Sequence, residues 1–159
     1  MSALLYAEQL RPGTVFDLGS TQISKEEILD FGRRFDPLPL HTDEDAAAAS
    51  RFGGLIASGF HTTAVFQRLV VDAVFSRAAV IAGREITSLR MRAPVRPGSV
   101  LHGSMEIVEV RARDDGTAVV HSRGTLANGS GTVVLELEGT TLWAHRPPGG
   151  IEDGGGLDR

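Results

Sequence analysis

An acid and an imidazole, Asp36 and His41, stand five positions apart in the sequence DPLPLH. Pro37 and Pro39 lie between them, and proline fixes φ and biases the preceding residue toward extended geometry. The spacing therefore predicts a stiff, non-helical loop that holds both side chains in place. A carboxylate and an imidazole held in this way can bind a water molecule between them and remove its proton.

A glycine-rich segment follows this pair. Gly53-Gly54, three apolar residues and Ser58-Gly59 precede a long apolar run. A glycine at a helix start lets a ligand approach the backbone N–H groups, where the helix dipole favours negative charge. We therefore expect a backbone donor at Gly59. Ser58 fits the N-cap of this helix better than a nucleophile, because the chain has no G-x-S-x-G turn.

Short elements before the helix should position the pair. Gly13 to Ile23 is predicted as a first strand, and a helix should run from Lys25 to about Phe35, with Ser24 and Glu27 forming a capping box. Pro37 prevents its continuation, so Asp36 should lie just past the helix end. A second short, alanine-rich helix is predicted from Glu44 to Ser50.

The longest predicted helix runs from Gly59 to Arg77. Apolar residues recur in it at helical spacing, whereas His61, Arg68 and Asp72 share another side. His61 is therefore interpreted as a surface or interface histidine. The apolar part is wider than an ordinary surface stripe, which predicts that a sheet wraps this helix.

From Glu85 onward the apolar period changes to two, which predicts strands. A phase slip near Ile107 indicates a β-bulge, and two turn signals, Asp114-Asp115-Gly116 and Asn128-Gly129, separate the later strands. Three long antiparallel strands in series after a helix predict an α+β meander around one long helix. Residues 1–146 should form one domain, and the Gly- and Pro-rich residues 147–159 a disordered tail.

Composition excludes several classes of protein. The 159 residues carry a formal net charge of −4, which argues against nucleic acid as a partner. The absence of cysteine excludes disulfides, thiolate nucleophiles and zinc–thiolate sites. No apolar stretch approaches the roughly 20 residues that span a bilayer, so we expect a soluble, cytoplasmic protein with no membrane partner.

The stretch Asp36-Pro37-Leu38-Pro39-Leu40-His41, followed by Phe52-Gly53-Gly54-Leu55-Ile56-Ala57-Ser58-Gly59, resembles the signature of MaoC-like, (R)-specific enoyl-CoA hydratases. The resemblance covers roughly Leu10 to Ala144 and implies the hot-dog fold, an antiparallel sheet wrapped around one long central helix. It implies that Asp36 and His41 are the catalytic dyad and that the Gly59 N–H binds the thioester carbonyl. One departure is Leu38, which stands where the family has an amide residue.

The implied reaction is hydration of an enoyl thioester or dehydration of a 3-hydroxyacyl thioester. It needs no cofactor or metal, because coenzyme A or an acyl-carrier pantetheine belongs to the substrate. The resemblance also implies a homodimer or a dimer of dimers. Leu38, Phe52 and Phe60 are candidates for an apolar acyl pocket beside Ser58.

Two other functions remain open at this stage. A thioesterase on the same fold would need a carboxylate on or near the central helix, and the only acid between Gly59 and Arg77 is Asp72, four turns in. A non-catalytic acyl-thioester-binding subunit would explain Leu38. Arg90, Arg92 and Arg96 either meet the coenzyme A phosphates or form a solvated strand face. The remaining histidines, His102, His121 and His145, are interpreted as structural.

Overall fold

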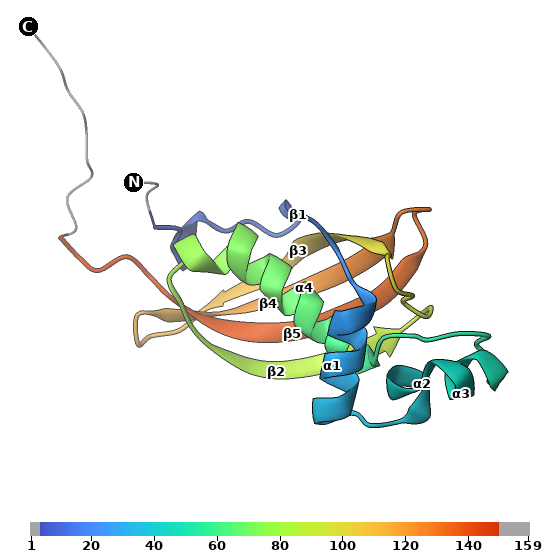
Figure 1. The fold of residues 1–159 in the computed structure, drawn as a ribbon. Coiled ribbons are helices and arrows are strands. Elements are labelled where there is room, and N and C mark those ends of the chain that lie inside the picture. Colours follow the sequence, from blue (N-terminus) through green and yellow to red (C-terminus); the bar gives the residue numbers. More distant parts are fainter. Residues whose placement is uncertain (1–3, 150–159) are drawn as a thin grey trace, which may run out of the picture.

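The fold is a curved antiparallel sheet with one long helix lying across it (Figure 1). The computed structural model describes residues 4–149. Its five strands lie in the order β1-β3-β4-β5-β2, and the long helix is α4. This is the hot-dog arrangement, so the predicted fold class is confirmed. The elements are η1 (Ala7–Gln9), β1 (Val15–Gln22), α1 (Lys25–Phe35), α2 (Pro39–Thr42), α3 (Glu44–Ala49), α4 (Gly59–Ala73), η2 (Phe75–Arg77), β2 (Val80–Met91), β3 (Val100–Ala112), β4 (Thr117–Asn128) and β5 (Val133–Ala144).

The predicted meander is strands β3, β4 and β5, joined by the two predicted turns. Pairing between β3 and β4 shifts register between Ile107 and Glu109, which confirms the bulge near Ile107. The sequence pattern placed the start of β2 at Glu85, but the strand begins at Val80. Its first half is exposed along the sheet edge, so the alternation that marks a half-buried strand is missing there.

Helix α4 packs closely on the sheet because two strands offer glycines beneath it. A Cβ at Gly124 of β4 would collide with the ring of Phe66. A Cβ at Gly103 of β3 would lie 3.2 Å from a methyl group of Leu69. The bulky side chains of the helix thus fill the space that these glycines leave. The predicted helix to Arg77 ends earlier, at Ala73, and η2 follows as a separate turn.

The start of α1 is fixed by the predicted capping box. Ser24 Oγ accepts a hydrogen bond from the Glu27 N–H at 3.1 Å, and Glu27 Oε2 accepts one from the Ser24 N–H at 2.7 Å. Helix α1 ends at Phe35, as expected, and buries Ile28. The short helix α3 ends one residue before the predicted Ser50.

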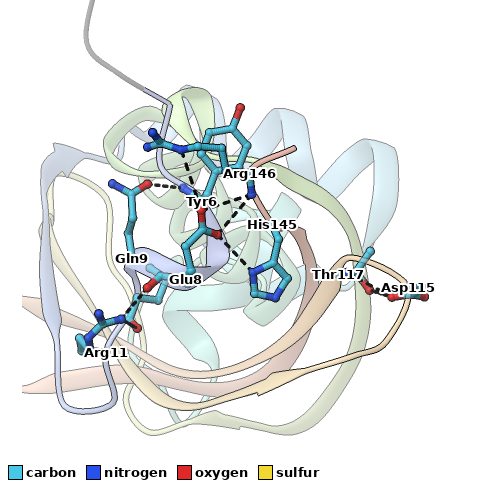
Figure 2. A network of polar contacts seen from close by, with 9 residues as sticks. Tyr6, Glu8, Gln9, Arg11, Asp115, Thr117, His145 and Arg146 are labelled. Atoms are coloured by element: carbon cyan, nitrogen blue, oxygen red, sulfur yellow. Dashed lines mark hydrogen bonds and ion pairs between the residues drawn. The ribbon is translucent and has the colours of Figure 1, made fainter. Parts of the chain in front are cut away.

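A polar clasp joins the two ends of the described chain (Figure 2). Glu8, in η1, accepts hydrogen bonds from the backbone N–H of Arg146 at 3.3 Å and lies 3.2 Å from His145 Nδ1. The Arg146 guanidinium lies over the Tyr6 ring at 5.4 Å. The clasp lies at the end of the molecule away from α1, α2 and α3 (Figure 1). Most of the predicted tail, residues 150–159, lies outside the described residues.

Candidate active site

Asp36 lies at the C-terminal end of α1, where the helix meets α2. Its N–H donates to the Gly32 carbonyl at 2.9 Å, which closes the last turn of α1. Gly32 also lets the two helices meet, because a Cβ there would lie 2.6 Å from the His41 carbonyl oxygen. Because Gly32 has no side chain, α1, whose C-terminal end carries Asp36, packs directly against α2, which carries His41.

His41 lies in one turn of helix, α2, and the prediction of a non-helical loop is wrong at this point. Proline is well suited to the first helical position because its missing N–H would have no intrahelical partner there. Pro39 occupies that position, with Leu38 as the N-cap. The turn is closed by the His41 N–H, which donates to the Leu38 carbonyl at 2.9 Å. The proline that was expected to exclude a helix thus begins one.

The two side chains converge. His41 Nε2 lies 3.5 Å from Asp36 Oδ2, with His41 6% exposed. His41 Nδ1 lies 2.8 Å from the Ile56 carbonyl oxygen, and because a carbonyl can only accept, Nδ1 carries a proton. In the neutral ring, Nε2 then presents its lone pair toward the carboxylate. Two acceptors this close are suited to share the protons of one water molecule.

Ser58 ties Asp36 to the start of α4. Its Oγ donates to Asp36 Oδ2 at 2.6 Å and accepts from the Phe60 N–H at 3.2 Å. Ser58 is therefore the predicted N-cap and also a hydrogen-bond donor to the acid. It is 1% exposed, so its hydroxyl has little access to water as an alternative partner.

A cavity of about 290 Å³ opens beside His41 and Gly59. Gly59 is the first residue of α4, and its N–H is one of the helix-start donors without an intrahelical acceptor. A larger cavity, about 360 Å³, lies along the other half of α4 and β2 and includes neither member of the pair. The smaller cavity is thus the candidate site. Its lining residues are His41, Phe52, Ile56, Ala57, Gly59, Thr62, Met91, Arg92, Ala93, Pro94, Val95 and Val134.

The candidate acyl-pocket residues divide between the cavity and the surface. Phe52 lines the cavity, as the sequence predicted. Leu38 and Phe60 do not line it, and they are 54% and 65% exposed. Helical geometry explains Phe60: it follows Gly59 by one residue, so its side chain projects about 100° around the helix from that position.

Sequence reasoning missed one wall of the cavity and the backbone partner of His41. The wall is formed by Met91 to Val95, at the end of β2 and in the loop after it. The partner is the Ile56 carbonyl, which fixes the His41 ring. Val95 accepts a hydrogen bond from the Ala57 N–H at 2.8 Å, joining this wall to the glycine-rich segment. Backbone partners of this kind leave no side-chain pattern that could have revealed them.

Two arginines near the cavity already have partners within the protein. Arg92 pairs with Glu136 on β5, with Nη2 2.6 Å from Oε2. Arg96 Nη2 donates to the Phe52 carbonyl at 2.6 Å and so holds the glycine-rich segment to the loop after β2. Arg90 is exposed on β2.

His61 is buried, so its interpretation as a surface histidine is wrong. It is 9% exposed and stacks on Phe31 of α1, with ring centroids 4.7 Å apart and planes 5° from parallel. Its Nδ1 is buried without a hydrogen-bond partner. Burial lowers the pKa of His61, against the opposing charge of Glu27. The helical pattern misplaced this residue because the pattern does not show that α1 covers this side of α4.

Each of the other three histidines has a carboxylate nearby, which the sequence spacing did not indicate. His102 lies 3.2 Å from Asp17, His121 lies 3.4 Å from Glu138, and His145 pairs with Glu8. The His121 contact is an ion-pair distance without hydrogen-bond alignment. Within residues 4–149, no group of three or more acidic or histidine side chains has the arrangement of a metal site.

Comparison with known proteins gives consistent results. The sequence model of the family described as "MaoC like domain" matches residues 8–129. The chain is similar to the crystal structure of a MaoC-like dehydratase from Rhodospirillum rubrum, with 34% identity, a TM-score of 0.83, and coverage of 90% of this chain and 99% of that one.

Two curated relatives match over part of their length. Uncharacterized protein YdeM of Bacillus subtilis is 36% identical over 61% of this chain and 69% of that protein. The 3-hydroxybutyryl-CoA dehydratase of Methylorubrum extorquens is 29% identical over 67% of this chain and 66% of that protein. Within residues 4–149, no helix is both long and apolar enough to cross a membrane.

Proposed function

Because the chain belongs to the MaoC-like dehydratase family, we propose that it adds water across the 2,3 double bond of an acyl thioester, or removes it in reverse. The substrate is an (R)-3-hydroxyacyl or trans-2-enoyl thioester of coenzyme A or of an acyl-carrier protein. The 3-hydroxybutyryl-CoA dehydratase similar to this chain supports the reaction class. The reaction proposed here uses no metal or cofactor.

The observation that carries this proposal is the 3.5 Å approach of His41 Nε2 to Asp36 Oδ2 beside the cavity at Gly59. A water molecule held by the pair loses a proton to it as its oxygen bonds to the β-carbon of the enoyl group. The α-carbon then gains a proton from the pair, so the net change is addition of H and OH. Dehydration follows the same steps in reverse.

The thioester oxygen gains negative charge in the transition state, and the Gly59 N–H is the proposed donor to it. The N-terminus of α4 adds the positive end of the helix dipole. Preorganised donors of this type typically contribute about 3–4 kcal/mol to transition-state stabilisation. The side chain of Ser58 holds Asp36 at this helix start, so acid and donor belong to one rigid unit.

The test is turnover of crotonyl-CoA by the full-length chain, followed as loss of enoyl absorbance without release of free thiol. Asp36→Asn and His41→Ala should each lower kcat by about 10²–10⁴-fold. Asp43→Asn, at the N-cap of α3, is a matched control that should keep kcat near the wild-type value. If both dyad variants kept wild-type turnover, this assignment would be wrong. A wild-type chain that binds enoyl-CoAs without converting them would be a non-catalytic subunit.

Thioester hydrolysis is less well supported by the site. The acid on α4, Asp72, is exposed, pairs with Arg68 at 2.6 Å and lines neither cavity. No carboxylate of α4 itself therefore stands where it could direct water at a carbonyl carbon in the site. The carboxylate beside the start of α4 is Asp36, which the proposed hydration already uses together with His41. Release of free thiol from butyryl-CoA would favour hydrolysis.

We also propose a homodimer, joined along the β2 edge of the sheet. β1 and β2 are the two outer strands, and unpaired strand edges are normally covered. β2 carries three exposed large apolar side chains, Ile81, Ile86 and Met91, which are 50% to 58% exposed. The larger cavity also opens beside Ile86. Pairing two β2 strands would cover this edge and the cavity together.

A further inference from the structure

Met91, the last residue of β2, lies directly against Gly59. A Cβ built on Gly59 would lie 2.5 Å from Met91 Sδ and 2.9 Å from its Cγ. Gly59 has no positive φ, so its backbone conformation does not itself demand glycine. A side chain at residue 59 would instead collide with the thioether of Met91.

Met91 also forms part of the outer wall of the cavity. In the single chain it is 50% exposed, on the β2 edge where the dimer is proposed, and it also lines the cavity that His41 and Gly59 share. An acyl group whose carbonyl meets the Gly59 N–H must therefore lie next to the Met91 side chain.

The rest of the lining restricts the chemistry of the acyl group. Three polar side chains line the cavity, and two of them are engaged elsewhere: Thr62 Oγ1 donates to the Ser58 carbonyl at 3.2 Å, and Arg92 pairs with Glu136. The third is His41 itself. Arg92 is the only permanently charged cation among these lining residues, so a second carboxylate on the substrate would have to compete with Glu136 for it.

We infer that Met91 is a specificity-determining residue that limits the site to a short, uncharged acyl group, by covering the cavity over Gly59. This inference rests on the proposed function, because it takes the acyl thioester as the ligand. The proposed substrate class is then a short, uncharged acyl thioester, and Met91 sets the upper limit on the length of its acyl group.

The experiment compares kcat/KM for crotonyl-CoA and trans-2-octenoyl-CoA in the wild type, Met91→Ala and Met91→Leu. In Met91→Ala the octenoyl-to-crotonyl ratio should rise about tenfold or more, since a methylene in an apolar pocket discriminates by roughly 10–200-fold. Met91→Leu keeps the side-chain volume and should leave the ratio near that of the wild type. A Met91→Ala ratio within about threefold of the wild type overturns the inference.

A second readout separates this inference from the proposed function. If the wild type converts neither substrate, the proposed function fails, and calorimetric titration with saturated butyryl-CoA and octanoyl-CoA replaces kinetics. A rise of about tenfold in the relative affinity for octanoyl-CoA in Met91→Ala still supports the role of Met91. An unchanged affinity ratio, or a wild type that binds neither thioester, overturns it.

Discussion

Two buried histidines near the start of α4 have different surroundings, and we therefore propose different roles for them. His41 has a partner on each ring nitrogen, the Ile56 carbonyl on Nδ1 and Asp36 beside Nε2. His61 has an aromatic ring against its face and no acceptor or donor for Nδ1. A fixed tautomer suits proton transfer, whereas an unpaired buried ring suits packing between helices. At this scale the partners of a residue, and not its type, determine its role.

His61 should make the stability of the protein depend on pH. Burial lowers its pKa below the ordinary 6.5, with the charge of Glu27 opposing this shift. As the pH falls below about 6.5 the unfolded chain binds a proton that the folded chain does not, so the free energy of unfolding decreases. His61→Phe keeps a ring against Phe31 and should show less of this decrease, as measured by urea unfolding between pH 7.5 and pH 5.5.

A matched control for this prediction is Gln67→Ala, which changes an exposed residue of the same helix, α4, without removing a titratable group. It should retain the pH dependence of the wild type. An identical pH dependence in wild type and His61→Phe would show that protonation of His61 does not contribute to it.

At the scale of elements, the contact between α4 and the sheet depends on where the strands lack side chains. Phe66 lies over Gly124, and Leu69 lies over Gly103. A glycine also lets α1 approach α2, because Gly32 lies against the backbone of His41. In each case a glycine sets how closely two elements approach, and so sets the position of the residues that they carry.

Gly124→Ala should lower the free energy of unfolding by about 1–3 kcal/mol, because the added methyl group overpacks the core against Phe66. Gly83→Ala is the matched control: it also lies in a strand, and a Cβ there has nothing within 4 Å. Chemical denaturation measures both. Adding Phe66→Leu should recover part of the loss, and strict additivity of the two substitutions would contradict the proposed contact.

At the scale of the whole molecule, α4 separates the clasp from the candidate active site. Its 15 residues span about 22 Å at 1.5 Å per residue. The clasp at Glu8 lies at the end of the molecule away from α1, α2 and α3 (Figure 1, Figure 2). Asp36 and His41 meet beside the cavity at Gly59, the first residue of α4. Stability at the clasp and chemistry at the site should therefore vary independently.

Glu8→Gln should destabilise the protein at pH 7 and leave kcat near the wild-type value. Burial raises the pKa of Glu8, but hydrogen bonds from the N–H groups of Glu8 and Arg146 and from His145 outweigh this and hold it below the ordinary 4.5. Its stabilising effect is present above about pH 4.5 and is lost as the pH falls through the lowered value. Thermal unfolding should thus show a smaller difference from the wild type at pH 3.5, and Glu109→Gln serves as an exposed control. A large loss of kcat in Glu8→Gln would show that the two ends are coupled.

Ile86→Glu should raise the dissociation constant of the proposed dimer by about 10–100-fold, because it would bury a charge in the apolar edge of β2 that the interface covers. Val15→Glu is the matched control, since Val15 is exposed on β1 at the opposite edge of the sheet. Sedimentation equilibrium measures the dissociation constant of each variant. A dimer broken by Val15→Glu and kept by Ile86→Glu would place the interface on the other edge.

The sequence by itself determined most of the local structure. The capping box of Ser24 and Glu27, the end of α1 before Asp36, the start of α4 at Gly59 and the β-bulge near Ile107 were predicted correctly, because neighbouring residues determine them. The resemblance of the stretch from Asp36 to Gly59 to the family signature also indicated where the candidate site lies. The helix ends depend on contacts within a few residues, which a one-dimensional pattern contains.

Tertiary structure decided what covers each element. It buried His61 beneath α1, turned Leu38 and Phe60 toward solvent, and placed Met91 against Gly59 across 32 positions of sequence. It also placed β2 beside β5, which leaves the β2 edge exposed. The periodicity of a segment shows that one side is apolar, but the partner of that side comes from a distant part of the chain and is set only when the segments pack together.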